Sequence, residues 1–336
     1  MLKAIDLFAG CGGFSTGFMQ AGFDITHAVE FDEQIASTYA KNHPDTMLVI
    51  DDIKNIDNSE IFQEGMTDII IGGPPCQGFS MAGARIRGGF VDDSRNYLFK
   101  HYFNIVSRVM PKVFIMENVK GIRTMQNGEI FEEIVNAFQN IGYDVQYKVF
   151  KASDYGVPQA RERIIIIGCK HKWDFDEVID KVKSRMQFEK ATVWDVIYDL
   201  EKLPTDGSAN IKNHTATKHN IIATNRMNKI SNGENYTSLK ETINTVHSGS
   251  YGRLEKERVA PTITTRFDTP SGGRFIHPTL DRTLTPRESA RLQSFPDDFE
   301  FLGTKTSICK QIGNAVPPKV AYFLAEIAKE LLNNEQ

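Results

Sequence analysis

A cysteine directly behind two prolines is the residue in this sequence best suited to act as a nucleophile. Cys76 follows Pro74 and Pro75, which end the apolar run Asp68-Ile-Ile-Ile-Gly-Gly73. An apolar run bounded by glycine and proline predicts a buried strand, and two prolines, which fix φ and lack an N–H, stop it. We therefore expect Cys76 just past a strand's C-terminal end, where ligands bind in open α/β sheets. The alternative is a buried cysteine that packs as a small hydrophobic side chain.

Charged side chains accompany two further strand-like runs. Glu117 lies near the end of the apolar run 112–119, beside the cysteine strand if the strands follow sequence order. Gln159, Arg161 and Arg163 alternate before another apolar run, so in an extended segment they share one face. Such side chains need buried partners, and Glu117 or an anionic ligand would serve. Ordinary surface ion pairs are the alternative.

A glycine-rich turn near the N-terminus indicates a ligand that the backbone approaches closely. The strand-like run 3–8 is followed by Gly10, Gly12 and Gly13 and then by a helical pattern. Glycines permit close approach, and the helix N-terminus offers free N–H groups. The spacing differs from the GxGxxG pattern of dinucleotide enzymes, which argues against a nicotinamide oxidoreductase.

Acidic residues at the ends of the next two strands favour a bound nucleoside. Glu30 ends the run 25–30, where it could accept hydrogen bonds from ribose hydroxyls, and Phe31 could cover a purine. Asp51 and Asp52 end the next run and leave the register open by one residue. Helix N-capping is the simpler role for these carboxylates.

Composition places the chain among ordinary globular proteins. The 336 residues include four cysteines without a CxxC pair, so neither a disulfide framework nor a zinc site is indicated. No apolar run approaches the roughly 18 residues of a membrane helix, and the N-terminus does not resemble a signal peptide. We therefore expect a cytoplasmic protein with no membrane partner.

Charge is distributed unevenly along the chain. Residues 201–295 hold fourteen Lys and Arg against nine Asp and Glu, about +5, whereas the whole chain carries -4. The remainder is therefore near -9. The asymmetry indicates one basic face on an acidic body, with chance fluctuation as the alternative.

Alternating strand and helix patterns continue to about residue 185 and then stop. The segment 82–93, which is rich in glycine, predicts a loop able to close over a substrate. From 186 to about 280 the chain is polar and irregular, suited to hydrogen bonding with a DNA groove or to a decorative insertion. Thr285 and Glu288 then form a capping-box pattern, 311–318 reads as a compact loop, and 319–332 as a packed helix.

Six segments, in order, resemble the cytosine-5 DNA methyltransferase family of bacterial restriction–modification systems. They are Asp6-Leu-Phe-Ala-Gly-Cys-Gly-Gly13, Gly73-Pro-Pro-Cys-Gln77, Glu117-Asn-Val119, Gln159-Ala-Arg-Glu-Arg163, 287–299 and Gly313-Asn-Ala-Val316. The resemblance implies an α/β fold with a Rossmann-like, mostly parallel sheet that binds S-adenosylmethionine without a metal. It also implies a smaller, irregular, β-rich target-recognition domain. We place the catalytic domain at 1–185 and 303–336, and the target-recognition domain at 186–302.

The resemblance also implies roles for individual residues. Cys76 matches the nucleophile and Glu117 the acid at the cytosine ring edge, while Arg163 would hold the base and Glu117, and Arg161 would support phosphate and thiol. The positions around the cofactor are matched by Phe8, Gly10, Gly12, Gly13, Glu30, Phe31, Asp52, Pro74, Leu98 and Asn314. Contacts to DNA are expected from Gln77, Ser80, Arg85, Arg87 and Arg266.

The implied reaction is methylation of carbon 5 of a flipped-out cytosine through a covalent bond between Cys76 and carbon 6. The expected partner is double-stranded DNA, with functional pairing to a restriction endonuclease and a monomeric protein. Methylation of an RNA cytosine, as in a tRNA, and a catalytically silent DNA-binding regulator are the alternatives.

Overall fold

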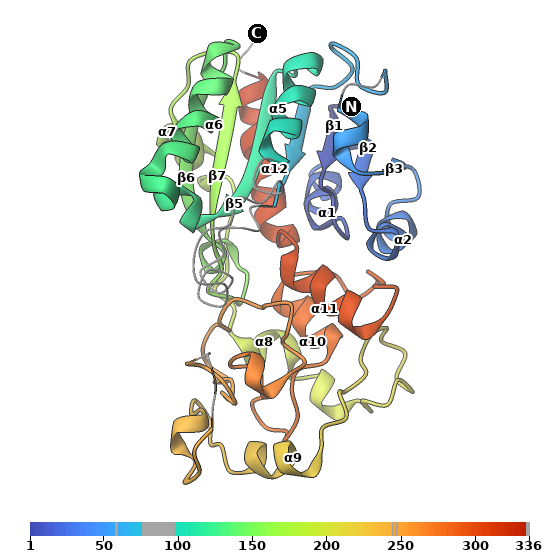
Figure 1. Ribbon diagram of the computed structural model, residues 1–336, viewed down its shortest axis with the longest axis vertical. Coiled ribbons are helices and arrows are strands. Elements are labelled where there is room, and N and C mark those ends of the chain that lie inside the picture. The colour runs from blue at the N-terminus through green and yellow to red at the C-terminus, as the bar shows by residue number, and fades with distance from the viewer. Residues whose placement is uncertain (58–59, 76–97, 244, 246–247, 334–336) are drawn as a thin grey trace.

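The structure is a computed structural model that describes residues 1–57, 60–75, 98–243, 245 and 248–333. Two lobes are visible in Figure 1. The sheet lobe, residues 1–185 and 318–333, holds every named strand and lies above the irregular lobe, residues 193–314. None of the helices in the described ranges has the length and apolar content that a membrane crossing needs.

A seven-stranded, mostly parallel sheet forms the centre of the sheet lobe. The strands are β1 (Lys3–Leu7), β2 (Asp24–Glu30), β3 (Met47–Ile50), β4 (Ile69–Gly72), β5 (Val113–Val119), β6 (Asp144–Lys151) and β7 (Glu162–Cys169). Their order is β3-β2-β1-β4-β5-β7-β6. The first five are parallel, and β7 is antiparallel to both β5 and β6. This confirms the fold class expected from the sequence.

Helices cover both faces of the sheet. Successive strand residues point to opposite sides, so the apolar strands present side chains on both faces that need cover. Ile69 and Ile71 pack with α1, α7 and α12, whereas Ile70 packs on the other face with α3, α5 and α6. The bounds are α1 (Gly13–Gln20), α2 (Glu33–Asn42), α3 (Ile53–Ile56), α5 (Leu98–Val109), α6 (Glu129–Asn140), α7 (Phe175–Lys183) and α12 (Pro318–Asn333). Figure 1 shows α5 and α6 in front of the sheet and α12 behind it.

Helices α1 and α12 lie unusually close together. A Cβ added to Gly17 would be 2.5 Å from the Ala321 Cβ and 2.5 Å from the Pro318 carbonyl oxygen. Only glycine permits that approach. The sequence elements at the two ends of the described chain therefore share one core on the same face of the sheet.

The strand order reverses beside β1. Strands β2 and β3 lie on one side of it, and β4 and β5 on the other. In open α/β sheets such a switch point opens a crevice at the carboxyl ends of the strands. That crevice lies where β1 leads into the glycine-rich turn and β4 leads into Pro74.

The described residues of the irregular lobe form no sheet. Its helices are α8 (Val193–Ile197), α9 (Ile221–Asn228), α10 (Pro286–Leu292) and α11 (Lys305–Asn314), and 3₁₀ turns occur at 200–202, 236–238 and 270–272. Its described residues form isolated bridges, such as Arg253 with Ile276, but no named strand. The β-rich character expected for 186–302 is therefore wrong.

In the irregular lobe, arginine side chains make hydrogen bonds to backbone carbonyls that neighbouring strands would make in a sheet. The guanidinium of Arg253 donates to the carbonyls of Met227, Ile230, His277 and Leu280 and to Asp281. Arg287, fully buried, donates to the carbonyls of Lys212, Pro296 and Phe299. Backbone groups that a ladder would pair are thus satisfied by side chains.

Two local sequence predictions have opposite outcomes. The capping box is confirmed: the Thr285 hydroxyl accepts from the Glu288 N–H, and the Glu288 carboxylate accepts from the Thr285 N–H. The loop predicted at 311–318 is wrong in its first half, because residues 311–314 continue α11. Gly313 lies within the helix, where a Cβ would be 2.6 Å from the backbone of Thr264 and of Thr265. Glycine therefore allows that backbone to approach the helix.

Candidate active site

Two adjoining cavities lie at the carboxyl ends of β1, β2, β4 and β5. The larger has a volume of about 530 Å³ and the smaller about 350 Å³. Phe8, Glu30, Phe31 and Pro75 line both of them. Of the predicted site residues, the larger cavity brings together Phe8, Gly10, Gly13, Glu30, Phe31, Pro74, Glu117, Arg161, Arg163 and Asn314. The smaller adds Asp52 and Leu98.

A left-handed backbone opens the glycine-rich turn. Phe8 has φ 60° and Gly10 has φ 58°, a region that non-glycine residues adopt at a cost. Glu30 holds this backbone, since its carboxylate accepts from the Gly10 N–H at 2.9 Å and from the N–H groups of Phe31 and Asp32. Burial raises the pKa of Glu30 above its ordinary value, and the hydrogen bonds from the Asp32 and Gly10 N–H groups offset only part of that rise. The turn is therefore preformed around a carboxylate that also lines the cavities.

Gly12 lies next to the turn but lines neither cavity. It has φ 95°, and a Cβ there would lie 2.3 Å from the His43 ring. His43 accommodates that approach by packing flat on Tyr39 and bonding to Thr16. Burial lowers the pKa of His43 to about 4. Sequence reasoning missed this neutral histidine, because nothing around residue 43 connects it to the turn.

Asp6 is a second residue that sequence reasoning left without a role, although it begins the Asp6–Gly13 segment. It is 1% exposed and lines the larger cavity. Its Oδ2 accepts from the Ser15 hydroxyl at 2.6 Å, while Oδ1 has no hydrogen-bond partner among the described residues. Burial raises the pKa of Asp6 to about 7. An unpaired buried oxygen is costly unless a ligand or water meets it.

The smaller cavity presents an aromatic face and, beside Glu30, two aspartates. Phe31 is 71% exposed, unusual for a phenyl ring beside a cavity. Asp52 caps α3 by accepting from the Lys54 N–H, and Asp51 accepts from the Asp52 N–H. Both aspartates line the cavity, so the register that the sequence left open places both carboxylates there.

Glu117 and Arg163 form an ion pair across neighbouring strands. Arg163 stands opposite Val119 in the β5–β7 register, two residues from Glu117 on the same face. Its Nε lies 2.9 Å from the Glu117 Oε1. The side chains are 12% and 21% exposed, enough to face a cavity while largely withdrawn from water. The partner that the sequence analysis suggested for the arginine strand is therefore present.

The same edge also holds the proline turn in place. The Asn118 side chain donates to the Pro74 carbonyl at 3.0 Å. Asn118 follows Glu117 directly, so one strand end carries both the acid and the support for the residues that precede Cys76. Pro75 lines both cavities.

Arg161 points to the C-terminal end of α11. It is 2% exposed and donates to the carbonyls of Gly313 at 2.9 Å and Asn314 at 3.3 Å. Burial lowers the pKa of Arg161 to about 9, with the neighbouring Arg163 adding to the fall and Glu117 opposing it. It still carries its charge at neutral pH. Its Nε has no partner among the described residues.

Several predicted residues cannot be placed at the cavities. Cys76, Gln77, Ser80, Arg85 and Arg87 lie outside the described residues, as does the predicted loop 82–93. Arg266 is exposed and lines neither cavity. Within the described ranges, no group of three or more His, Cys, Asp or Glu side chains could hold a metal ion.

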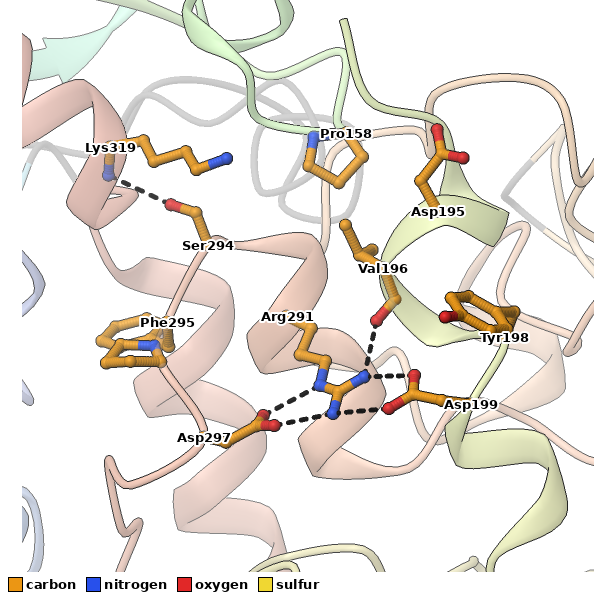
Figure 2. A pocket seen from close by; sticks show the side chains of 11 residues that line it. Pro158, Asp195, Val196, Tyr198, Asp199, Arg291, Ser294, Phe295, Asp297 and Lys319 are labelled. Atoms are coloured by element: carbon orange, nitrogen blue, oxygen red, sulfur yellow. Dashed lines mark hydrogen bonds and ion pairs between the residues drawn. The ribbon is translucent and has the colours of Figure 1, made fainter. Parts of the chain in front are cut away.

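A third hollow, of about 400 Å³, lies apart from these residues (Figure 2). It is bordered by α8, the end of α10 and the start of α12. Arg291 forms ion pairs with both Asp199 and Asp297 beside it, at 2.6 Å each. Arg291 thus links the end of α8 to the end of α10. None of the predicted site residues lines this hollow.

Comparison with known proteins gives consistent matches along the whole chain. A family model described as C-5 cytosine-specific DNA methylase matches residues 2–330. The Type II methyltransferase M1.HphI of Haemophilus parahaemolyticus is 38% identical over 337 residues, covering 99% of this chain and 88% of that protein. The Type II methyltransferase M.NgoPII of Neisseria gonorrhoeae is 35% identical, covering 98% of this chain and 96% of that protein.

Solved structures share the fold. A prophage-encoded E. coli protein assigned as a DNA modification methyltransferase superposes with a TM-score of 0.78 at 31% identity, covering 99% of this chain and all of that one. The S. pombe Dnmt2 methyltransferase superposes with a TM-score of 0.68 at 18% identity, covering 99% of this chain. The second likeness concerns the fold alone.

Proposed function

This chain belongs to the C-5 cytosine-specific DNA methylase family and is a DNA cytosine-5 methyltransferase, and from that premise we propose how its site works. The methyl group of S-adenosylmethionine is transferred to carbon 5 of a cytosine flipped out of duplex DNA. The observation that carries the proposal is the Glu117–Arg163 pair, which shares one cavity with the glycine-rich turn and the Pro74–Pro75 turn.

The two adjoining cavities fit S-adenosylmethionine. The exposed ring of Phe31 offers a stacking face for adenine, and Glu30 and the Asp51–Asp52 pair offer acceptors to ribose hydroxyls. The unpaired Oδ1 of Asp6 offers an acceptor to the ammonium group of the cofactor's amino-acid end. The α1 N-terminus would attract the carboxylate of that same end. When bound, this cofactor supplies an electrophilic methyl group. No metal is needed for that chemistry.

Glu117 and Arg163 would bind the ring edge of the cytosine. Glu117 would bind nitrogen 3 of the cytosine and share a proton with it, and so absorb the electron density that develops on the ring. Arg163 holds the Glu117 carboxyl by its Nε and stabilises developing negative charge on the opposite ring edge. The largely buried position of both groups strengthens these interactions relative to water.

Cys76 would be the nucleophile. Its thiolate attacks carbon 6, a sulfur–carbon bond forms, and the electron pair of the 5,6 double bond moves to carbon 5. After carbon 5 gains the methyl group it loses its proton, the double bond returns and the sulfur leaves. A cationic group close to a cysteine favours the thiolate over the thiol. Removing an aromatic base from the stack costs a few kcal/mol, which contacts to DNA must supply.

Residues 186–302 are our candidate for target recognition, with Arg266 as a backbone contact. Arg266 is exposed on the segment whose backbone passes Gly313, close to the cavity edge. Gln77, Ser80, Arg85 and Arg87 are the further proposed DNA contacts. We propose a monomeric, cytoplasmic enzyme that protects host DNA against a partner endonuclease, as the Type II names of the relatives suggest.

The experiment that tests the function is methylation of a plasmid by the purified protein, followed by sequencing for 5-methylcytosine. Modification at one recurring sequence is expected, and an unmodified plasmid would contradict the proposal. A duplex that carries 5-fluorocytosine at the identified position should then trap a covalent complex, because the fluorine cannot leave as a proton does. The same assays on RNA distinguish the RNA alternative.

A further inference from the structure

Two buried glutamines join the lobes by a chain of hydrogen bonds. The Ile263 N–H donates to the Gln159 Oε1 at 2.8 Å. The Gln159 Nε2 donates to the Gln293 Oε1 at 2.9 Å, and the Gln293 Nε2 donates to the Ile312 carbonyl at 2.7 Å. Neither glutamine is exposed to solvent. The chain runs from the segment before β7, through the residue after α10, to the last turn of α11.

The direction of this chain is fixed by its ends. The N–H of Ile263 can only donate, and the carbonyl of Ile312 can only accept. Each amide therefore has one orientation in which all its neighbours are satisfied. A fully satisfied buried network of this kind is rigid, and removing one member takes a hydrogen bond from each of its neighbours. The Gln159 Nε2 also donates to the Leu292 carbonyl, at 3.2 Å.

The C-terminal end of α11 depends on these side chains. The helix has no left-handed cap residue, since Ala315 is extended with φ -60° and ψ 147°. The carbonyls of a helix end need partners. Here Gln293 donates to Ile312, and Arg161 donates to Gly313 and Asn314. The cation of Arg161 also suits the negative end of the helix dipole.

This chain of hydrogen bonds closes into a ring, because Arg161, two residues after Gln159, donates to the same end of α11. The ring spans both halves of the site. Gln159 and Arg161 lie two residues apart on one face of the same extended segment, which continues to Arg163 at the Glu117 carboxyl. The other side of the ring is the α11 end, where Asn314 lines the larger cavity. One side therefore carries the cytosine contacts and the other a cofactor contact.

We propose that Gln293 is a positioning residue that fixes the cytosine pocket relative to the cofactor cavity. This rests on the proposed function. Gln293 lines neither cavity and acts through Gln159 and the α11 end. Transfer of a methyl group requires both reactants in near-attack geometry, and a misplacement of about 1 Å can cost a hundredfold in rate. Addition of the thiol to cytosine needs only the base and its own contacts.

The test separates these two steps. Duplex DNA tritiated at cytosine carbon 5 releases tritium when the thiolate adds at carbon 6, a solvent proton joins carbon 5, the tritium leaves and the sulfur departs. This exchange is measured with S-adenosylhomocysteine, which has no methyl group to donate. Methyl transfer is measured on the same DNA with S-adenosylmethionine at saturation. The ratio of the two rates is the readout.

Gln293→Leu removes both hydrogen bonds of the side chain at similar volume. We expect methyl transfer to fall about 30- to 100-fold, while exchange stays within about threefold of the wild type. Gln293→Glu keeps the acceptor for Gln159 and loses the donor to Ile312, and should shift the ratio in the same direction. If the leucine variant does not fold, the glutamate variant decides.

Asn42→Leu is the matched control. Asn42 also joins the lobes, by donating to the Glu300 carbonyl and accepting from the Glu300 N–H, both at 2.9 Å, but it lies outside the ring. Its ratio should equal that of the wild type. Equal loss of both rates in the Gln293 variants would assign Gln293 a merely structural role and overturn the inference. A wild type without exchange or methylation would instead contradict the proposed function.

Discussion

The two lobes solve the same problem, satisfaction of the buried backbone, by different means. In the sheet lobe, parallel ladders pair the backbone and leave isoleucines such as Ile70 and Ile71 to form apolar cores on each face. In the irregular lobe, Arg253 and Arg287 cap carbonyls one by one. The first solution is generic and tolerates any well-packed apolar residue. The second depends on individual donors.

The same difference separates the tasks we assign to the lobes. A regular sheet fixes strand ends relative to one another, which suits chemistry that must be placed to a fraction of an ångström. A lobe made of side-chain-to-backbone contacts can change its surface loops without disturbing a ladder, which suits sequence recognition. The comparison teaches that the polar content of residues 186–302 is partly internal structure and only partly surface.

We expect Cys76→Ala to have the largest effect, because it removes a group needed for the chemistry and leaves DNA binding unchanged. Methyl transfer should fall ~10⁴-fold or more, since the nucleophile is lost. Affinity for the target duplex, measured by fluorescence anisotropy, should change by no more than about threefold. Arg266→Ala should do the reverse, lowering affinity and reducing the salt slope by about one. Retained turnover in the Cys76 variant would remove this thiol from the mechanism.

Arg253→Met tests the irregular lobe, and Ile71→Ala the sheet. Loss of Arg253 leaves several buried carbonyls without donors, and we expect a stability loss of about 3–5 kcal/mol. Ile71→Ala should cost about 2–5 kcal/mol through a cavity. Guanidinium unfolding measures both, and hydrogen exchange should show the Arg253 effect confined to the irregular lobe.

Two matched variants sharpen that prediction. Arg253→Lys keeps the charge but cannot reach the same set of carbonyls, so it should restore less than half of the stability. Arg258→Met removes an exposed arginine from its pair with Glu255 and should cost less than about 1 kcal/mol. A severe loss at Arg258, or none at Arg253, would contradict the role of buried donors.

Low pH should destabilise both lobes, most strongly through His43 in the sheet lobe and His277 in the irregular lobe. Burial lowers the pKa of His43 and of His277 to about 4, against 6.5 in the unfolded chain. Between these values the unfolded state binds more protons, so stability present above pH 6.5 is lost as the pH falls toward 4. Each histidine should account for up to about 3 kcal/mol.

Thermal melting between pH 4 and 8 measures this loss in the wild type and in His43→Gln and His277→Gln. Each variant should flatten the curve by part of its acid slope, because burial also lowers the pKa of His27, His214 and His219. His277 also lies 3.6 Å from Glu288, whose pKa is lowered by Arg282 despite its burial. An unchanged acid slope in both variants would show that other groups govern the transition.

Phe31→Ala should have the smallest effect. Loss of a stacking face costs about 1–2 kcal/mol, or roughly 5- to 30-fold in the Kd for S-adenosylmethionine. The rate at saturating cofactor should be nearly unchanged. Calorimetric titration gives the Kd, and Tyr198→Ala, which removes another exposed ring on the irregular lobe, serves as the control. Equal effects at both positions would argue against stacking on Phe31.

Sequence reasoning recovered the sheet because its strands are short apolar runs with clear ends. The predicted runs 3–8, 25–30 and 112–119 agree with β1, β2 and β5 to within a residue or two. Alternation places Gln159, Arg161 and Arg163 on one face and leaves their partner open between Glu117 and an anionic ligand. The family resemblance pairs Arg163 with Glu117. The same logic fails for Asp6 and His43, whose roles depend on neighbours that no local pattern reveals.

The irregular lobe resisted prediction for physical reasons. The end of α11 is capped by Arg161, 152 residues earlier in the chain, so Gly313 and Asn314 read locally as a turn. The arginine count that indicated a basic face includes Arg253 and Arg287, both buried and used internally. Long-range hydrogen bonds leave no periodic signature, in contrast to apolar faces.

The close packing of α12 on α1 bears on how this enzyme is made. The ribosome completes β7 at residue 169 and reaches α12 only at residue 318, an interval of roughly 7–30 seconds at about 5–20 residues per second. During that time one face of the sheet has α1 and α7 but lacks α12. A nascent chain therefore exposes an apolar surface that chaperones can occupy, and it completes the sheet lobe only after the irregular lobe has been synthesised.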